Sequence, residues 1–203
     1  MLLHPLLVAR GYRVRGLIRK PEQADDLRQA GAEPVLCDLE TKTDISEFVG
    51  QADAVVFAAG AGPGSGAERK WTVDRDGAVK LILSAEKNNI RRYVLVSAMN
   101  LEMPRGSEVF QVYLKAKAES EAALRESGLD WTIVRPGSLT DEPGTGHVAI
   151  APELPKGDIP RADVAAVLAE VLDTPKTTGL QFDLTSGKQP VREAVEELSF
   201  QID

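Results

Sequence analysis

The residues best suited to do chemistry in this sequence are Tyr113 and Lys117, which are four positions apart. On a helix this spacing places the phenol and the ammonium on one face, one turn apart. A neighbouring cation is expected to lower the pKa of a phenol from about 10 toward working pH, as an acid or base for hydride chemistry requires. Ser97, at the end of the preceding predicted strand, could hold a substrate oxygen. The alternative is an amphipathic helix with a partly exposed tyrosine.

These residues must be positioned by a regular alternation of strands and helices. Strands are predicted at Arg13–Ile18, Pro34–Cys37, Ala54–Ala59, Tyr93–Val96, Trp131–Val134 and Leu180–Leu184. Helices are predicted from Pro21 to Gly31 and at Thr43–Val49, Lys70–Asn89, Glu108–Ser127, Arg161–Asp173 and Val191–Leu198. This alternation, with short connections, is typical of a parallel sheet with helices on both faces. The sequence therefore predicts one doubly wound α/β domain over residues 1–203.

Ligands of such a sheet bind beyond the carboxyl ends of its strands, so the residues that follow each strand are candidates for binding. Arg19 and Lys20 follow the first strand. In a dinucleotide-binding fold, a guanidinium at this position suits a phosphate on the 2′-oxygen of the ribose, and the alternative is a solvated basic turn. Asp38 follows the second strand and either borders an adenine pocket or caps a turn. Small residues at 58–60 let a ligand or another backbone approach closely. Pro136 begins a rigid turn that lines a nicotinamide pocket or is an ordinary crossover.

Composition excludes several classes of protein. The 43% hydrophobic and 27% charged fractions are those of a globular protein rather than a disordered chain or a coiled coil. The net charge of −7 disfavours a nucleic-acid surface, although residues 1–20 hold five basic groups and no acid. A single cysteine, Cys37, excludes an internal disulfide and favours a reducing cytoplasm. No apolar run is long enough for a membrane helix, and His4 and His147 lack partners at metal-ligand spacing, so no metal is expected.

Taken together, the sequence resembles the short-chain dehydrogenase/reductase superfamily, near its atypical NmrA-like and flavin-reductase-like branch. The likeness is carried, over nearly the whole chain, by VRGLIR (14–19), CDL (37–39), FAAG (57–60), VLVSA (94–98), YLKAK (113–117), TIVRPG (132–137) and RADVA (161–165). The resemblance implies a Rossmann-type fold that binds NADP(H) in preference to NAD(H), with the catalytic residues Ser97, Tyr113 and Lys117. It implies cofactor contacts at Arg19, Lys20, Asp38, Leu39, Ala58, Ala59, Gly60, Ser97, Lys117 and Pro136.

Two features depart from the family pattern. The separation between Ser97 and Tyr113 is shorter than in the orthodox branches, which puts the role of the serine in doubt. Residues 1–10 resemble only the last turns of the family's first helix, so the chain is expected to lack the preceding strand and Gly-rich phosphate turn. In the usual strand order 3-2-1-4-5-6 that strand is central, and two strand edges should therefore be left unpaired.

Three functions remain open from the sequence. The first is an NADP(H)-dependent oxidoreductase or epimerase/dehydratase-like enzyme that acts on a small molecule through Tyr113 and Lys117. The second is an NADP(H)-binding redox sensor without catalysis, and the third is a chain that binds no nucleotide. The loops at 61–68, 98–107 and 138–147 would shape a substrate pocket, but they indicate no chemical class of substrate. A homodimer is expected by analogy alone.

Overall fold

Strands and helices alternate along the computed structural model, which describes residues 2–62, 64–102, 104 and 106–198. The strands are β1 (Arg15–Ile18), β2 (Glu33–Leu36), β3 (Ala54–Phe57), β4 (Arg92–Val96), β5 (Asp130–Pro136), β6 (Ser138–Thr140), β7 (His147–Ala151), β8 (Asp158–Pro160), β9 (Leu180–Ser186) and β10 (Gln189–Pro190). The α-helices are α1 (Leu3–Ala9), α2 (Ala24–Gln29), α3 (Ser46–Val49), α4 (Ala67–Arg69), α5 (Asp76–Lys87), α6 (Glu108–Glu126), α7 (Arg161–Asp173) and α8 (Val191–Leu198). All six strands predicted from the sequence are confirmed, within two residues at each end.

The central sheet has six strands in the order β10-β7-β9-β5-β4-β3. Its core, β3, β4, β5 and β9, is parallel, as predicted. The sheet is nevertheless mixed, because β7 runs antiparallel to β9, and β10 runs antiparallel to β7. Strand β7 was not predicted from the sequence, and the predicted loop at 138–147 contains β6 and only the first residue of β7.

Strands β1 and β2 form a separate parallel pair, and β6 and β8 form another. Leu17 of β1 packs against the same core cluster as Val55 and Phe57 of β3, yet the two strands belong to different sheets. Among the described residues no strand is hydrogen-bonded to both β1 and β3. The division therefore falls where the sequence predicts two unpaired strand edges, and the fold is an α/β, Rossmann-type arrangement with a divided sheet.

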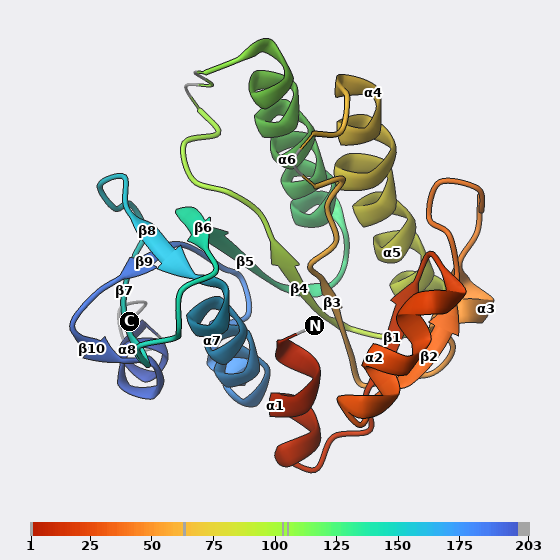
Figure 1. Cartoon of the computed structure of the whole chain (residues 1–203), viewed down its shortest axis with the longest axis horizontal. Helices are drawn as coiled ribbons and strands as arrows, with labels where there is room; N and C mark the ends of the chain where they lie inside the picture. Colours follow the sequence, from red (N-terminus) through yellow and green to blue (C-terminus); the bar gives the residue numbers. More distant parts are fainter. Residues whose placement is uncertain (1, 63, 103, 105, 199–203) are drawn as a thin grey trace.

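Helices cover both faces of the central sheet (Figure 1). Helices α5 and α6 lie on one face, and α1, α7 and α8 lie on the other. The alternation of side chains along β4 supplies both cores, because Tyr93 and Leu95 belong to the cluster under α5 and α6, whereas Val94 belongs to the cluster under α7 and α8. This two-sided burial explains the continuous apolar runs of the central strands.

The segment predicted as one helix, Lys70–Asn89, is not uniform. It is π-helical from Lys70 to Arg75 and becomes α-helical only at Asp76, where α5 begins. A π-helical turn contains one more residue than an α-helical turn and is frequent at functional sites, because it redirects side chains. Here the turn holds Lys70 and Asp74, both of which point into the protein. None of the described helices has the length and apolar character needed to cross a membrane.

Candidate active site

Helix α6 presents a row of polar side chains to the interior. Its N-terminus is capped by Ser107, whose hydroxyl accepts a hydrogen bond from the backbone N–H of Phe110 at 3.3 Å. Tyr113, Lys117 and Glu121 follow at four-residue intervals, so all three lie on one face of the helix. Only 3% of Lys117 and 1% of Glu121 are exposed. The predicted helical pairing of Tyr113 with Lys117 is therefore present, and it continues one turn further.

Lys117 is held at the carboxyl end of β4. Its Nζ donates a hydrogen bond to the carbonyl oxygen of Val96 at 3.0 Å and lies 3.6 Å from Oδ1 of Asp74. The same nitrogen lies 5.9 Å from the ring centroid of Tyr113 and 5.6 Å from that of Phe57. Burial lowers the pKa of the Lys117 ammonium, and the carboxylate of Asp74 acts in the opposite direction.

The pKa of Tyr113 is the first correction to the sequence analysis. The nearby ammonium was expected to bring this pKa down toward working pH, but burial of the phenol, with a smaller contribution from Asp74, raises it to about 12. Desolvation disfavours the phenolate, and the negative charge of Asp74 offsets the neighbouring cation. The phenol of Tyr113 is neutral at pH 7, as an ordinary phenol is, and its raised pKa makes it a weaker acid, so donating its proton requires a neighbouring positive charge that stabilises the phenolate.

Ser97 is the next residue after Val96, on whose carbonyl Lys117 is anchored. Its backbone N–H donates to Val134 of β5, and its side chain is buried. The hydroxyl oxygen has no hydrogen-bond partner among the described residues. Buried polar atoms are normally hydrogen-bonded, so an unpartnered hydroxyl at the end of β4 is a position where a bound oxygen or nitrogen would be stabilised.

The cofactor candidates at the end of β3 form an open surface of small residues. Ala58, Ala59 and Gly60 are all exposed although they directly follow a buried strand. Below them lies Asp74, because a Cβ atom on Gly60 would come within 3.0 Å of its Oδ1. Pro136, at the end of β5, is buried and accepts a hydrogen bond from Met99 through its carbonyl oxygen.

The candidates after β1 and β2 are arranged around Glu40. Arg19 is exposed, and its guanidinium lies 3.5 Å from a carboxylate oxygen of Glu40, which also accepts from Arg69 at 2.7 Å. Asp38 caps the turn that contains Glu40, as its Oδ1 accepts from the Glu40 N–H at 2.9 Å, which is the structural alternative raised from the sequence. Lys20 is exposed on the adjoining turn. Leu39 packs against the core while its carbonyl accepts from Lys80.

Two residues of the site were missed in the sequence analysis. Asp74 is 1% exposed; one oxygen accepts from the Ala61 N–H at 3.2 Å, and the other has no hydrogen bond within the described part of the chain. Lys70 is 8% exposed, and its Nζ lies 5.5 Å from the ring centroid of Tyr113. For Asp74 a signal existed, because this carboxylate falls among the apolar residues Val73 and Ala78 of the predicted helix.

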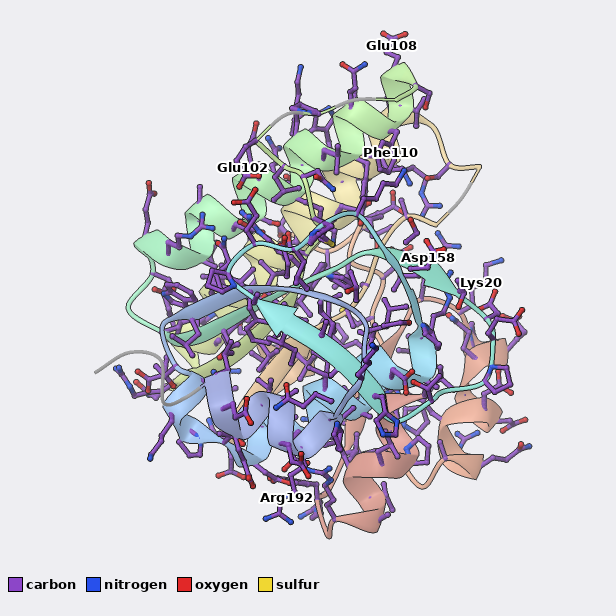
Figure 2. All side chains as sticks on the ribbon, turned by 90° about the vertical axis from the view of Figure 1, so that its left-hand side faces the viewer. Lys20, Glu102, Glu108, Phe110, Asp158 and Arg192 are labelled. Carbon is purple, nitrogen blue, oxygen red and sulfur yellow. The ribbon has the colours of Figure 1, made fainter. Side chains whose placement is uncertain are left out.

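A second buried polar cluster lies farther along α6. Arg135 of β5 donates from Nε and Nη2 to the two carboxylate oxygens of Glu121 at 2.8 and 2.7 Å, and from Nη1 to Glu102 at 2.8 Å. Arg125 also donates to Glu121, at 2.6 Å. These residues, with Gln181, border an open cavity of about 270 Å³. Figure 2 shows Glu102 on the loop that runs beside α6.

The three predicted pocket loops are described in part. Residue 63 of the loop at 61–68 and residues 103 and 105 of the loop at 98–107 lie outside the described residues. In the loop at 138–147, Asp163 of α7 accepts from the N–H groups of Thr145 at 2.9 Å and Gly146 at 2.8 Å. Within the described ranges, no group of three or more His, Cys, Asp or Glu side chains could hold a metal ion.

Comparison with known proteins places this chain in a family. Residues 1–175 match the model of the family described as NAD(P)H-binding. The chain is 40% identical over 189 residues to the uncharacterized sugar epimerase YhfK of Bacillus subtilis (strain 168), covering 92% of this chain and 88% of YhfK. A solved structure from Bacillus halodurans, provisionally named an NAD-dependent epimerase/dehydratase, superposes with a TM-score of 0.91 at 38% identity, over 97% of this chain and 92% of that one. The oxidoreductase ylbE of Lactococcus lactis superposes with a TM-score of 0.86 at 27% identity, over 100% of this chain and 92% of that one. The chain therefore belongs to the NAD(P)H-binding family.

Proposed function

We propose that this protein is an NADP(H)-dependent oxidoreductase that reduces a carbonyl group and uses Tyr113 as the proton donor. The observation that carries the proposal is the convergence of Tyr113 and Lys117 on the end of β4, where Ser97 presents a buried hydroxyl without a partner. The name of the relative ylbE, an oxidoreductase, supports the same class of reaction.

The residues present fit the nicotinamide end and the 2′-phosphate end of a dinucleotide. Ala58, Ala59 and Gly60 leave the end of β3 open to a flat ligand, and the unpartnered Ser97 hydroxyl offers a hydrogen bond near the reacting end. Arg19 would hold the 2′-phosphate, which is the basis for proposing NADP(H) over NAD(H). Lys117 would hold the hydroxyls of the nicotinamide ribose. When bound, the reduced nicotinamide supplies the hydride.

The protein's own side chains supply the proton and stabilise the charge that its transfer leaves. The neutral phenol of Tyr113 donates its proton to the carbonyl oxygen, so that the substrate leaves as an alcohol and the phenolate stays behind. The ammonium groups of Lys117 and Lys70, 5.9 and 5.5 Å from the ring centroid, stabilise that phenolate. The hydroxyl of Ser97 holds the substrate oxygen. Proton transfer of this kind contributes about 10²–10⁴-fold to a rate.

The second candidate function is an epimerase, which the names of YhfK and the B. halodurans protein favour. A reductase and an epimerase both need the same proton transfer at Tyr113. They differ in cofactor consumption, because a reductase consumes one NADPH per substrate molecule, whereas an epimerase returns the cofactor unchanged. The buried free thiol of Cys37 is compatible with a reducing cytoplasm, where we propose the protein acts.

The test combines cofactor binding with turnover. NADPH is titrated into the 203-residue chain, and its oxidation is followed with a panel of aldehydes and ketones, for wild type and Tyr113→Phe. The control is Tyr12→Phe, since the Tyr12 hydroxyl donates to Asp173, the last residue of α7, and α7 covers the face of the sheet opposite α6 (Figure 1). We expect Tyr113→Phe to bind NADPH normally and to lose about 10²-fold or more of its activity. NADPH binding without turnover by wild type would favour the redox sensor, and no binding would favour the chain that holds no nucleotide.

A further inference from the structure

Lys70 is a buried cation without a carboxylate partner. Its ammonium donates a hydrogen bond to the carbonyl oxygen of Gly62 at 2.9 Å, and no carboxylate of the described residues lies within 4.0 Å of it. An ammonium has three N–H donors, and burial makes each unused donor costly. Lys70 is therefore equipped to bind a further acceptor.

The charges around Tyr113 do not balance. Two ammonium groups, those of Lys70 and Lys117, face a single carboxylate, Asp74, which lies 3.6 Å from Lys117. The ammonium of Lys70 is close enough to lower the pKa of Lys117. The neighbouring cluster contributes no net charge, because its two arginines, 125 and 135, are matched by two glutamates, 102 and 121. One positive charge thus remains uncompensated beside the proposed proton donor, and an anionic ligand would compensate it.

The adjacent residue, Arg69, points to a different part of the site. Arg69 donates to Glu40, the carboxylate that also meets Arg19, and so belongs to the region proposed for the 2′-phosphate. Lys70 instead lies over the ring of Tyr113. The two consecutive cations are thereby divided between the cofactor's phosphate side and the side where the reaction takes place.

A large apolar side chain also packs against Tyr113. The ring of Phe110 stacks on that of Tyr113, with centroids 5.7 Å apart and 30° between the planes. Phe110 is 48% exposed, and Figure 2 shows it at the N-terminal end of α6, near Glu108. A ligand bound at Tyr113 would contact the ammonium of Lys70 with one of its groups and the ring of Phe110 with another.

We propose that Lys70 binds a carboxylate of the substrate, so that the substrate class is carbonyl compounds that carry an acid group on an apolar, planar body. The carboxylate forms a charge-assisted hydrogen bond with Lys70, the planar body lies against Phe110, and the carbonyl oxygen meets the hydroxyl of Tyr113. This inference rests on the proposed function, because it assigns the substrate of the same site.

The first experiment measures binding without any reaction. Benzoate and its neutral analogue benzamide are titrated into the NADPH-loaded protein, and their dissociation constants are determined by ligand-observed NMR. Wild type should bind benzoate more tightly. Lys70→Gln, which keeps an N–H donor for Gly62 but loses the charge, should weaken benzoate about tenfold or more and leave benzamide within about twofold. Lys115→Met, at an exposed lysine of α6, is the matched control and should change neither.

The second experiment measures selectivity in turnover, with 4-formylbenzoate and its methyl ester as substrates. Lys70→Gln should raise KM for the acid about tenfold or more and leave the ester unaffected. Lys70→Arg should keep the preference for the acid. Equal losses with both substrates, or weaker NADPH binding without discrimination between them, would assign Lys70 to the cofactor and overturn the inference.

The two experiments separate this inference from the proposed function. If neither aldehyde is reduced but benzoate binding depends on the charge of Lys70, the carboxylate site stands and the reductase assignment fails. If wild type binds benzoate no better than benzamide, the carboxylate site is wrong whatever the turnover, and that comparison needs no variant to fold. Circular dichroism of Lys70→Gln verifies that any change in binding comes from the folded protein.

Discussion

The ammonium of Lys117 lies 3.6 Å from the carboxylate of Asp74, and both side chains are almost completely buried. The pair joins the π-helical turn at Lys70–Arg75 to the middle of α6, and the Val96 carbonyl joins it to the end of β4. The π-helical turn, α6 and the end of β4 are thus fixed relative to one another beside Tyr113. A buried ion pair contributes little net stability, but the loss of one partner leaves an uncompensated charge.

Asp74→Asn should therefore destabilise the fold by about 3–5 kcal/mol, as expected when a buried pair loses one member. Lys117→Met should have a similar effect for the opposite charge. The double variant should be more stable than the sum of the two losses predicts, by about 0.5–3 kcal/mol of coupling energy. Urea unfolding of the four proteins measures this cycle. Additive losses would mean that the two charges do not interact.

The pKa of Tyr113 gives a prediction for pH. Because burial and Asp74 raise this pKa to about 12, the phenol should stay neutral at pH 10, where an ordinary tyrosine is half ionised. Removing the negative charge in Asp74→Asn should lower the pKa. The measurement is ¹³C NMR of tyrosine labelled at Cζ, with the Tyr113 signal assigned from Tyr113→Phe. A phenol half ionised at or below pH 10 in wild type would contradict the structure.

The sequence was sufficient for the central strands and for the pairing of Tyr113 with Lys117. Buried parallel strands are continuous apolar runs, and a four-residue spacing on a helix always shares a face, so both features are local patterns. The division between β1 and β3 was also predictable, because it follows from the order of the elements along the chain. The fit to the NAD(P)H-binding family agrees with the motifs identified.

The remainder depended on contacts between distant segments. Nothing local in the sequence distinguishes a π-helical turn from the α-helix that follows it, and this turn is what points Lys70 and Asp74 toward Tyr113. The raised pKa of Tyr113 could not be foreseen for the same reason, since Asp74 is 39 positions away from it in the sequence. Likewise Glu40, Arg19 and Arg69 meet only in the folded chain.

The choice between NADPH and NADH should depend on Arg19. Its guanidinium is exposed and only loosely held, 3.5 Å from Glu40, so it is free to turn toward a 2′-phosphate. Arg19→Ala should weaken NADPH binding about tenfold or more and leave NADH within about twofold. Glu40→Gln should act in the opposite direction, because it removes a competing anion. Arg13→Ala, at another exposed arginine of the same basic segment, is the control, and fluorescence titration gives the dissociation constants.

The cluster around Arg135 predicts a contrast between its two glutamates. Glu121 is 1% exposed and binds Arg135 through both carboxylate oxygens, whereas the side chain of Glu102 is 67% exposed and makes one contact. Glu121→Ala would leave the buried guanidinium of Arg135 without its main counter-charge, at a cost of about 3–5 kcal/mol. Glu102→Ala removes a solvent-screened pair and should cost at most about 1 kcal/mol. Urea unfolding measures both, and Glu121→Gln adds a check, since it keeps the shape of the side chain and loses only its charge. Equal costs for Glu121→Ala and Glu102→Ala would show that the burial of Glu121, one helical turn from Lys117, does not stabilise this end of α6.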